Sequence, residues 1–337
     1  AARDVLADQC TPQVVRAIEE GGRTAEATTA LWEQLEATGL ADALLSEDAG
    51  GAGLGLGQVF GVLEQCGAHA LPLPLGETMV ARALLAQAGV ARPAGSIALA
   101  RGEHLANGGL RCALVRSGQV AAAVLVQTGT EWRLLNTADA QGAAQALALD
   151  AALTWTAVQV QAAPAVEVNG ALDVRTLQAA VVAAQMAGAL SSVFQRSLQY
   201  ANERQQFGRP IGKFQAIQHQ LAVMSEHVFA ARMAAQLGCS AGHDGMGVVP
   251  DRLRVATAKA RCSEAALVVS ELAHAIHGAI GFTEEYDLQL FTRRLHAWRQ
   301  TAGSEAYWYG VAGEALLHHQ GMTLDIVRRI TDVDTVL

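Results

Sequence analysis

The spacing of hydrophobic residues changes twice along the chain, near residues 95 and 172. Before the first change, apolar positions recur at helical intervals and short polar stretches separate them. Thr11-Pro12 has the form of an N-cap followed by a first-turn proline. Gly39 is placed to end a helix that passes through Leu31 and Leu35. With further helices expected over residues 58–66 and 77–88, the pattern predicts an N-terminal helical domain over residues 1–92.

Over residues 93–170 the apolar runs are short, and Gly, Asn, Asp and Ser separate them. Runs of this length between turn-forming residues are typical of β-strands joined by tight turns. We therefore predict a small central β domain. Its expected strands are at residues 97–100, 113–115, 121–126, 132–135 and 154–160.

Over residues 171–337 the helical period returns. Apolar residues at alternating steps of three and four line one face of each of two long helices, as packing in a bundle requires. Residues 183–189 of the preceding helix are mostly Ala and Gly, which lets neighbouring backbones approach closely. The predicted fold class is α+β, mostly α, ending in a C-terminal four-helix bundle. The two apolar faces comprise Phe214, Ile217, Leu221, Met224 and Val228, and Ala258, Cys262, Ala265, Val269, Leu272 and Ile276.

Composition and charge narrow the class of protein. The net charge of −8 is spread along the chain without a basic patch, which argues against nucleic acid as a partner. Gln, Arg, His or Glu interrupts each of the most apolar segments before about twenty residues, so no membrane span is expected. Arg3, Asp4 and Asp8 break up the start of the chain, which lacks the order of a signal peptide. A cytoplasmic protein is expected.

The five cysteines are scattered along the chain and lack a C-x-x-C spacing. An odd, scattered set favours small core residues in a reducing compartment over a disulfide framework or a zinc site, and no metal is expected. The cysteines are Cys10, Cys66, Cys112, Cys239 and Cys262.

A glycine-rich run at residues 50–57, GGAGLGLG, invites comparison with dinucleotide-binding loops. The run lacks the G-x-G-x-x-G spacing, and no predicted strand precedes it. We interpret it as a loop between helices.

Residues 200–224 carry the most specific motif of the chain, YANERQQFGRPIGKFQAIQHQLAVM. This segment resembles the signature of the acyl-CoA dehydrogenase family, in which one helix ends in Arg-x-x-Phe-Gly and the next begins with Phe-Gln-x-x-Gln. The N-terminal Leu-Trp helix, Ser46-Glu47-Asp48 and the glycine run agree with the same family. The order of helical domain, β domain and bundle also agrees, so the resemblance covers the whole chain.

The resemblance implies a flavoprotein with FAD as its cofactor. In the family this segment crosses a subunit interface and holds the adenosine-diphosphate half of a neighbour's FAD. Arginine is a permanent, forked donor that matches a pyrophosphate, and phenylalanine rings can flank a planar ring or a ribose. A surface ion pair with a local carboxylate is the alternative for the arginine. The residues to which the resemblance gives this role are Arg204, Gln206, Phe207, Ile211 and Phe214.

A second glycine motif, HGAIGFTEEY, begins at His277. In the family this motif contacts FAD from another subunit, which implies cofactor contacts for His277, Gly278 and Ala279. Glycine at such a place indicates a backbone brought close to a ligand. The chain departs from the family at Ala275, where glutamine is usual, and at Ala279, which replaces a glycine. His277 either hydrogen-bonds the cofactor or caps its own helix.

The reaction implied by the resemblance is α,β-dehydrogenation of an acyl-CoA thioester. A positioned carboxylate must remove the α-proton, because a proton beside a thioester is only weakly acidic, and FAD accepts the β-hydride. The family places this Glu in a Glu-Gly-Thr triplet or on the helix before Arg-x-x-Phe-Gly. Ungapped counting puts these places on Ala302 and near Gln178, neither of which is a base. Glu305 is the nearest carboxylate and the candidate base; a first-turn Glu favoured by the helix dipole is the alternative.

The central region departs from the family as well, since its Thr-Glu-Pro, Gly-Ser-Asp and Trp-x-Thr elements have no clear counterpart between Gly95 and Pro164. The interface segment that serves a neighbour's FAD is kept. This pattern resembles the smaller subunit of the two-chain α2β2 acyl-CoA dehydrogenases of bacterial steroid degradation. It implies a sister chain that supplies the carboxylate, a bulky steroid-derived acyl-CoA and an electron-transfer flavoprotein as acceptor. The alternatives are a self-sufficient homo-oligomer using Glu305 or another carboxylate, and a non-catalytic assembly subunit.

Overall fold

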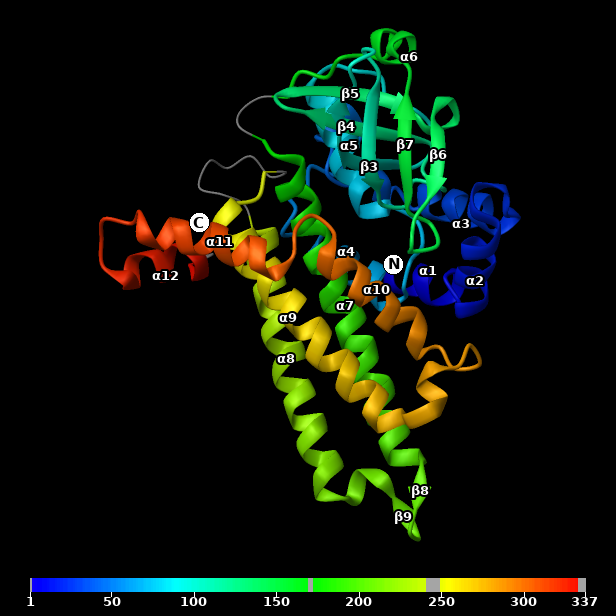
Figure 1. Cartoon of the computed structure of the whole chain (residues 1–337), viewed down its shortest axis with the longest axis vertical. Coiled ribbons are helices and arrows are strands. Elements are labelled where there is room, and N and C mark those ends of the chain that lie inside the picture. Colours follow the sequence, from blue (N-terminus) through cyan, green and yellow to red (C-terminus); the bar gives the residue numbers. More distant parts are fainter. Residues whose placement is uncertain (1, 169–171, 241–248, 333–337) are drawn as a thin grey trace.

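The chain forms N-terminal helices, a central β domain and a long helical bundle, in that order (Figure 1). The computed structural model describes residues 2–168, 172–240 and 249–332. The β domain lies at one end of the molecule. The bundle extends away from it to a small hairpin of β8 (Gln205–Gln206) and β9 (Arg209–Pro210) at the other end. The predicted α+β, mostly helical architecture is confirmed.

The N-cap and the helix end that the sequence indicated are both present, and the helices predicted over residues 58–66 and 77–88 are displaced by up to two residues. The Thr11 hydroxyl accepts a hydrogen bond from the backbone N–H of Val14 at 3.4 Å, so Thr11 is the predicted N-cap. Gly39, with a φ of 72°, follows the end of its helix as expected. The glycine run forms a loop, in which Gly50 and Gly53 have positive φ. The elements are α1 (Ala2–Gln9), α2 (Pro12–Gly21), η1 (Gly22–Thr24), α3 (Glu26–Ala37), η2 (Leu40–Asp42), η3 (Glu47–Ala49), α4 (Phe60–Ala68) and α5 (Leu75–Gln87).

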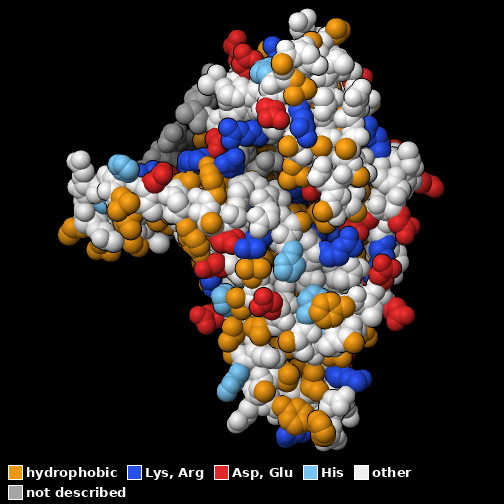
Figure 2. Space-filling model, viewed as in Figure 1, with side chains coloured by type: hydrophobic (Ala, Val, Ile, Leu, Met, Phe, Trp, Pro, Cys, Tyr) orange, Lys and Arg blue, Asp and Glu red, His pale blue; other side chains and the backbone are white. Residues whose placement is uncertain are grey.

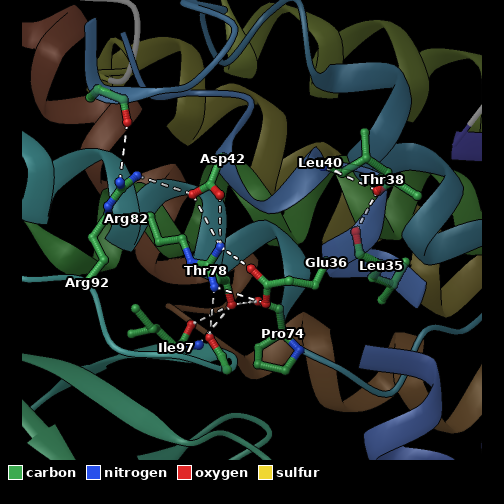
Figure 3. A network of polar contacts seen from close by, with 12 residues as sticks. Leu35, Glu36, Thr38, Leu40, Asp42, Pro74, Thr78, Arg82, Arg92 and Ile97 are labelled. Carbon is green, nitrogen blue, oxygen red and sulfur yellow. Dashed lines mark hydrogen bonds and ion pairs between the residues drawn. The ribbon is translucent and has the colours of Figure 1, made fainter. Parts of the chain in front are cut away.

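Helix α5 joins the N-terminal helices to the β domain (Figure 3). The buried guanidinium of Arg82 donates hydrogen bonds to the carboxylates of Glu36 at 3.1 Å and Asp42 at 3.2 Å. One turn earlier, the Thr78 hydroxyl accepts a hydrogen bond from the backbone N–H of Ile97 at 2.9 Å. Buried polar groups stabilise a fold only when they are paired. These contacts therefore hold the first strand of the β domain against the helices.

Two sheets make up the β domain. The first has the order β1-β4-β5, with β1 parallel to β4 and β4 antiparallel to β5. The second has the order β2-β3-β7-β6 and its pairs are antiparallel. The elements are β1 (Ile97–Arg101), β2 (Glu103–His104), β3 (Leu110–Val115), β4 (Ala123–Thr128), β5 (Glu131–Asn136), η4 (Thr137–Asp139), β6 (Gln141–Ala144) and β7 (Ala151–Trp155).

Strand β4 is buried on both of its faces. Val124 and Val126 belong to the core between the two sheets, whereas Ala123 and Leu125 belong to the large core shared with the helices. Successive side chains of a strand point to opposite faces. A strand covered on both sides therefore needs a continuous apolar run, which is the pattern found here.

The predicted strand over residues 154–160 is wrong beyond Trp155. There β7 ends, and the short helix α6 (Ala157–Ala162) follows. The Thr156 hydroxyl accepts a hydrogen bond from the Gln159 N–H, and the Gln159 side chain accepts one from the Thr156 N–H at 2.7 Å. This reciprocal pair is a capping box. A Thr-x-x-Gln start signal therefore outweighs the β-branched residues around it.

The bundle buries most of the two faces that the sequence predicted, whereas Phe214, Ile217 and Leu272 are half-buried. Leu221, Met224 and Val228 of α8 are buried, as are Cys262 and Val269 of α9. The five cysteines are buried and unbridged, as expected of small core residues. The elements are α7 (Val174–Glu203), η5 (Ile211–Lys213), α8 (Gln215–Cys239), α9 (Arg252–His277), η6 (Gly278–Phe282), α10 (Leu288–Gln300), α11 (Glu305–Leu317) and α12 (Thr323–Thr331).

Helices α4 and α7 pack backbone to backbone. A Cβ atom at Gly188 would collide with the carbonyl oxygen of Glu64, and one at Gly67 would collide with that of Gln185. The small residues of α7 therefore allow the close approach that the sequence predicted.

Two segments, Val174–Glu203 and Arg252–Phe282, are long and apolar enough to cross a membrane by length and composition alone. In the most apolar window, 78% of the first and 44% of the second are buried inside the protein. The core helix of a folded domain meets the same criteria. Because α7 packs against α4, α8, α9 and α10, we assign both segments to the bundle.

Candidate cofactor and substrate site

Helix α7 ends in the first predicted cofactor motif. Arg204 is its C-cap residue, and the Arg204 N–H donates a hydrogen bond to the Tyr200 carbonyl oxygen at 2.8 Å. The β8–β9 hairpin follows, and Gly208, with a φ of 77°, makes its turn. The Ile211 N–H donates to the Arg204 carbonyl oxygen at 2.8 Å and closes the hairpin. We call residues 204–214 the distal hairpin, since they lie at the end of the bundle away from the β domain (Figure 1).

The distal hairpin exposes aromatic and cationic side chains together. Phe207 is 92% exposed and has a φ of 52°, a left-handed conformation that is unfavourable for a bulky side chain. Its ring meets Phe214 edge-on at 6.2 Å between centroids, and the Arg209 guanidinium lies 4.2 Å from the Phe214 centroid. Arg204 forms no side-chain ion pair within the described ranges. Of the predicted FAD contacts, Arg204, Gln206 and Phe207 are exposed, and Ile211 and Phe214 are half-buried.

The second predicted motif starts at the end of α9. The buried His277 ring has Nδ1 at 2.7 Å from the Ala273 carbonyl oxygen and Nε2 at 3.3 Å from the Tyr286 hydroxyl. Burial lowers the pKa of His277 and favours the neutral ring. Gly278, with a φ of 64°, ends the helix, and it is exposed together with Ala279. The histidine ring therefore faces inward to partners in its own chain, and the backbone of Gly278 and Ala279 is the part open to a ligand.

The two motifs meet through Tyr200, which the sequence analysis did not single out. The Tyr200 ring stacks on His277 with 4.5 Å between centroids, and its hydroxyl lies 3.4 Å from the His277 carbonyl oxygen. Tyr200 is one helical turn before Arg204, and this spacing was the available signal. The structure thus brings both sequence motifs to the same end of the bundle.

A cleft of about 530 Å³ lies between the β domain and the bundle. We call it the interdomain cleft. Its lining comes from residues 101–103, strand β3 with the following Arg116, the first turns of α7, and residues 300–303 from the end of α10 to the turn before α11. These segments are far apart in the sequence, so no local pattern could have revealed the cleft.

Both positions where counting placed the family's catalytic Glu line the interdomain cleft. Ala302 has a φ of 58° at the turn before α11. Gln178 lies in α7, and its side-chain amide donates a hydrogen bond to the Leu99 carbonyl oxygen at 2.7 Å. Neither side chain can accept a proton at neutral pH. Among the described residues, Glu103 is the carboxylate in the lining.

Glu305 does not line the interdomain cleft. It is the first residue of α11, and its carboxylate forms an ion pair with Arg299, whose Nε donates at 2.9 Å. The hydrogen bonds from Arg299 hold the pKa of Glu305 below its usual range. A carboxylate that is paired, acidic and outside the cleft is poorly suited to take up an α-proton.

The architecture defines a class of proteins in which a β domain and a helical bundle enclose a cleft, and a bundle end carries an arginine–phenylalanine hairpin. Residues 174–317 match the family model "Acyl-CoA dehydrogenase, C-terminal domain". The chain is 30% identical over 298 residues to acyl-CoA dehydrogenase IpdE2 of Mycolicibacterium smegmatis, which covers 87% of this chain and 89% of that protein. The chain therefore belongs to the acyl-CoA dehydrogenase family, whose members are oxidoreductases of acyl-CoA thioesters.

Solved structures share the same fold. One chain of the ChsE4-ChsE5 complex from Mycobacterium tuberculosis superposes with a TM-score of 0.79 and 22% identity, over 95% of this chain and 96% of that one. A steroid acyl-CoA dehydrogenase (ACAD) of the Tcur3481-Tcur3483 pair gives a TM-score of 0.74 and 28% identity, over 94% of this chain and 95% of that one. Both structures hold two differently named chains. The predicted family and fold are confirmed.

Proposed function

We propose that this chain is a subunit of a heteromeric, FAD-dependent acyl-CoA dehydrogenase that shares its cofactor site with a sister chain. The sister chain supplies the carboxylate that removes the α-proton. The substrate is a bulky, steroid-derived acyl-CoA, which the likeness to a steroid ACAD supports. An electron-transfer flavoprotein takes up the electrons, as is usual in the family.

The placement of the two functional regions on α7 carries this proposal. Gln178 lines the interdomain cleft near the start of the helix, and Arg204 begins the distal hairpin at its end. At 1.5 Å per residue, these positions are separated by about 40 Å. The hairpin therefore cannot reach the cleft of its own chain. Its exposed Phe207 and Arg204 serve to bind the cofactor of another chain.

The distal hairpin fits the phosphate and adenosine part of FAD. Arg204 provides a fixed positive charge with a forked set of donors, and Arg209 adds a second one against the Phe214 ring. Phe207 offers an apolar face that water otherwise covers. When bound, FAD accepts the hydride from the substrate's β-carbon. The residues of this chain would hold and orient it.

A self-sufficient homo-oligomer is the second candidate function, and one observation favours it. Glu103 lies in the lining of the interdomain cleft, so a carboxylate is present there without matching either family position. A non-catalytic assembly subunit is the third candidate. It predicts that substitutions in the distal hairpin do not change the flavin content of the complex.

The test is the flavin content of this chain purified alone and together with a family chain encoded beside its gene. The proposal expects little flavin in the chain alone and about one FAD for each pair of unlike chains in the complex. Stoichiometric flavin and full turnover with this chain alone would favour the homo-oligomer. A flavin content of the complex that does not respond to changes in the hairpin would favour the assembly subunit.

A further inference from the structure

We infer that the interdomain cleft of this chain binds an oxyanion, a phosphate or carboxylate group, through Arg101, Arg111 and Arg175. Binding there does not require the shared FAD site, because it concerns a cleft at the other end of α7. The same cleft lacks a carboxylate at both positions to which counting assigned the family's catalytic Glu.

Three arginines converge on the cleft from separate elements. Arg101 ends β1, Arg111 lies on β3 and Arg175 lies in the first turn of α7. Arg101 and Arg111 are exposed and make no side-chain hydrogen bond or ion pair with the described part of the chain. Figure 2 shows Lys and Arg side chains gathered where the β domain meets the bundle. Guanidinium groups with free donors at one cavity are suited to bidentate binding of an oxyanion.

A fourth arginine has an unsatisfied donor in the lining. Arg116 is 5% exposed, and its Nη1 has no hydrogen-bond partner. It forms a buried ion pair with the Glu77 carboxylate at 3.6 Å, and Nη2 donates a hydrogen bond to the Gln185 side-chain oxygen. Glu77 therefore balances the charge of Arg116. Anion binding is assigned to the three outer arginines, Arg101, Arg111 and Arg175.

A neighbouring cavity of about 370 Å³ shares Arg101 and Arg175 with the cleft. It also contains Arg252, which pairs with Asp173 at 2.6 Å, and the Tyr307 ring, over which Arg175 lies at 4.5 Å from the centroid. Arg101 and Arg175 thus stand at the junction of two hollows. The space accommodates a ligand larger than a single oxyanion group, with the anion at the junction.

The charges around the cleft favour an anion in spite of the chain's acidic character. Glu103 is the opposing carboxylate in the lining, and it is the cross-strand neighbour of Arg111. Against it stand Arg101, Arg111 and Arg175, in a chain whose net charge is −8. Like charges repel and opposite charges attract across a few ångströms even in partly screened surroundings. Removal of Glu103 should therefore strengthen anion binding.

The test is isothermal titration calorimetry of the purified full chain with sodium pyrophosphate and, separately, with succinate. We expect one site in the cleft that is retained in Arg204→Ala, which removes the phosphate-binding arginine of the distal hairpin, and whose affinity falls as salt rises. Arg101→Gln, Arg111→Gln and Arg175→Gln should each weaken binding by about tenfold to a hundredfold, as expected for one lost charge-assisted contact. Glu103→Gln should tighten it a few-fold. Binding of pyrophosphate alone identifies a phosphate ligand, and binding of succinate alone identifies a carboxylate.

Arg293→Gln is the matched control, because Arg293 is an exposed arginine of α10 outside the cleft. Its affinity should equal that of the unchanged chain. No heat of binding with either probe would overturn the inference, as would equal losses in Arg101→Gln and Arg293→Gln. The thermal midpoint of each variant shows whether its fold is intact. Arg101 and Arg111 are both exposed, so if one of these variants unfolds, the other still tests the inference.

Discussion

The Nζ atom of Lys259 donates a hydrogen bond of 2.9 Å to the carbonyl oxygen of Gly303. Gly303 follows Ala302, the position to which ungapped counting assigns the family's catalytic Glu. Lys259 is fully buried in α9, and it also donates to the Arg299 carbonyl oxygen at 2.9 Å and to the Ser263 hydroxyl at 3.0 Å. One buried amine therefore holds the turn between α10 and α11 in place, although sequence reasoning did not find it.

Lys259→Met should change how stability depends on pH. Burial lowers the pKa of Lys259 from 10.5 to about 7. At a pH between these two values the amine is neutral in the folded chain and protonated in the unfolded chain, so unfolding takes up a proton. The unchanged chain should therefore gain stability as pH rises through this window, and the variant should lack that contribution. Thermal midpoints of both proteins from about pH 7 to about pH 10 measure it. A difference in midpoint that stays constant over the window would contradict the assignment.

Arg204→Ala should weaken FAD binding and leave the fold intact. The side chain is exposed and unpaired within the described residues, so little native packing is lost. Loss of a charge-assisted contact with phosphate costs about 2 to 3 kcal/mol, or roughly 30-fold to 150-fold in affinity. Flavin absorbance of the complex after dialysis gives the readout. Arg293→Ala serves as the control, and equal flavin retention in the two variants would show that Arg204 is a surface residue.

Glu305→Gln should change kcat only a few-fold in the complex of unlike chains. Its carboxylate is occupied by Arg299 and lies outside the cleft lining. Loss of a true general base would instead lower kcat by about 100-fold or more. The measurement is dehydrogenation of a steroid-derived acyl-CoA with an artificial electron acceptor. Glu103→Gln is run beside it, because a large loss there, in the chain alone, would support a self-sufficient enzyme.

The ion pair of Glu305 should also appear in the acid stability of the chain. Hydrogen bonds from Arg299 lower the pKa of Glu305, so the pair stabilises the folded state above the ordinary pKa of a glutamate. This contribution should be lost as pH falls through the lowered pKa. The difference in thermal midpoint between the unchanged chain and Glu305→Gln should therefore shrink on acidification. A difference that grows toward acid pH would contradict this account.

Gly208→Val should destabilise the chain by about 1 to 2 kcal/mol, because a β-branched side chain is disfavoured in the left-handed region. Gly208 has a φ of 77°, although a Cβ atom there would meet no other group. Gly61→Val is the matched control: Gly61 lies in α4 with helical backbone and equally open space. Urea unfolding of both variants separates backbone strain from side-chain size. Equal stabilities would show that the hairpin tolerates any residue at its turn.

The order of helices, strands and bundle could be predicted from the spacing of apolar residues. The face of a helix or strand that contacts the core must be apolar, whichever element it packs against. The two motifs predicted to contact the cofactor could also be recognised, because the local chain sets the conformations of Arg204, Phe207 and Gly208. The boundary at Thr156 was missed, because a short capping box competes with β-branched residues within the same few positions.

The site itself was decided by tertiary structure. Ala302 and Gln178 could be named by counting, but only the fold shows that they share a cleft while Glu305 lies outside it. The arginines of that cleft come from a strand end, a second strand and a helix start, so no spacing in the sequence connects them. Their convergence depends on how the β domain docks on α7, and side-chain burial and charge pairing exist only after that docking.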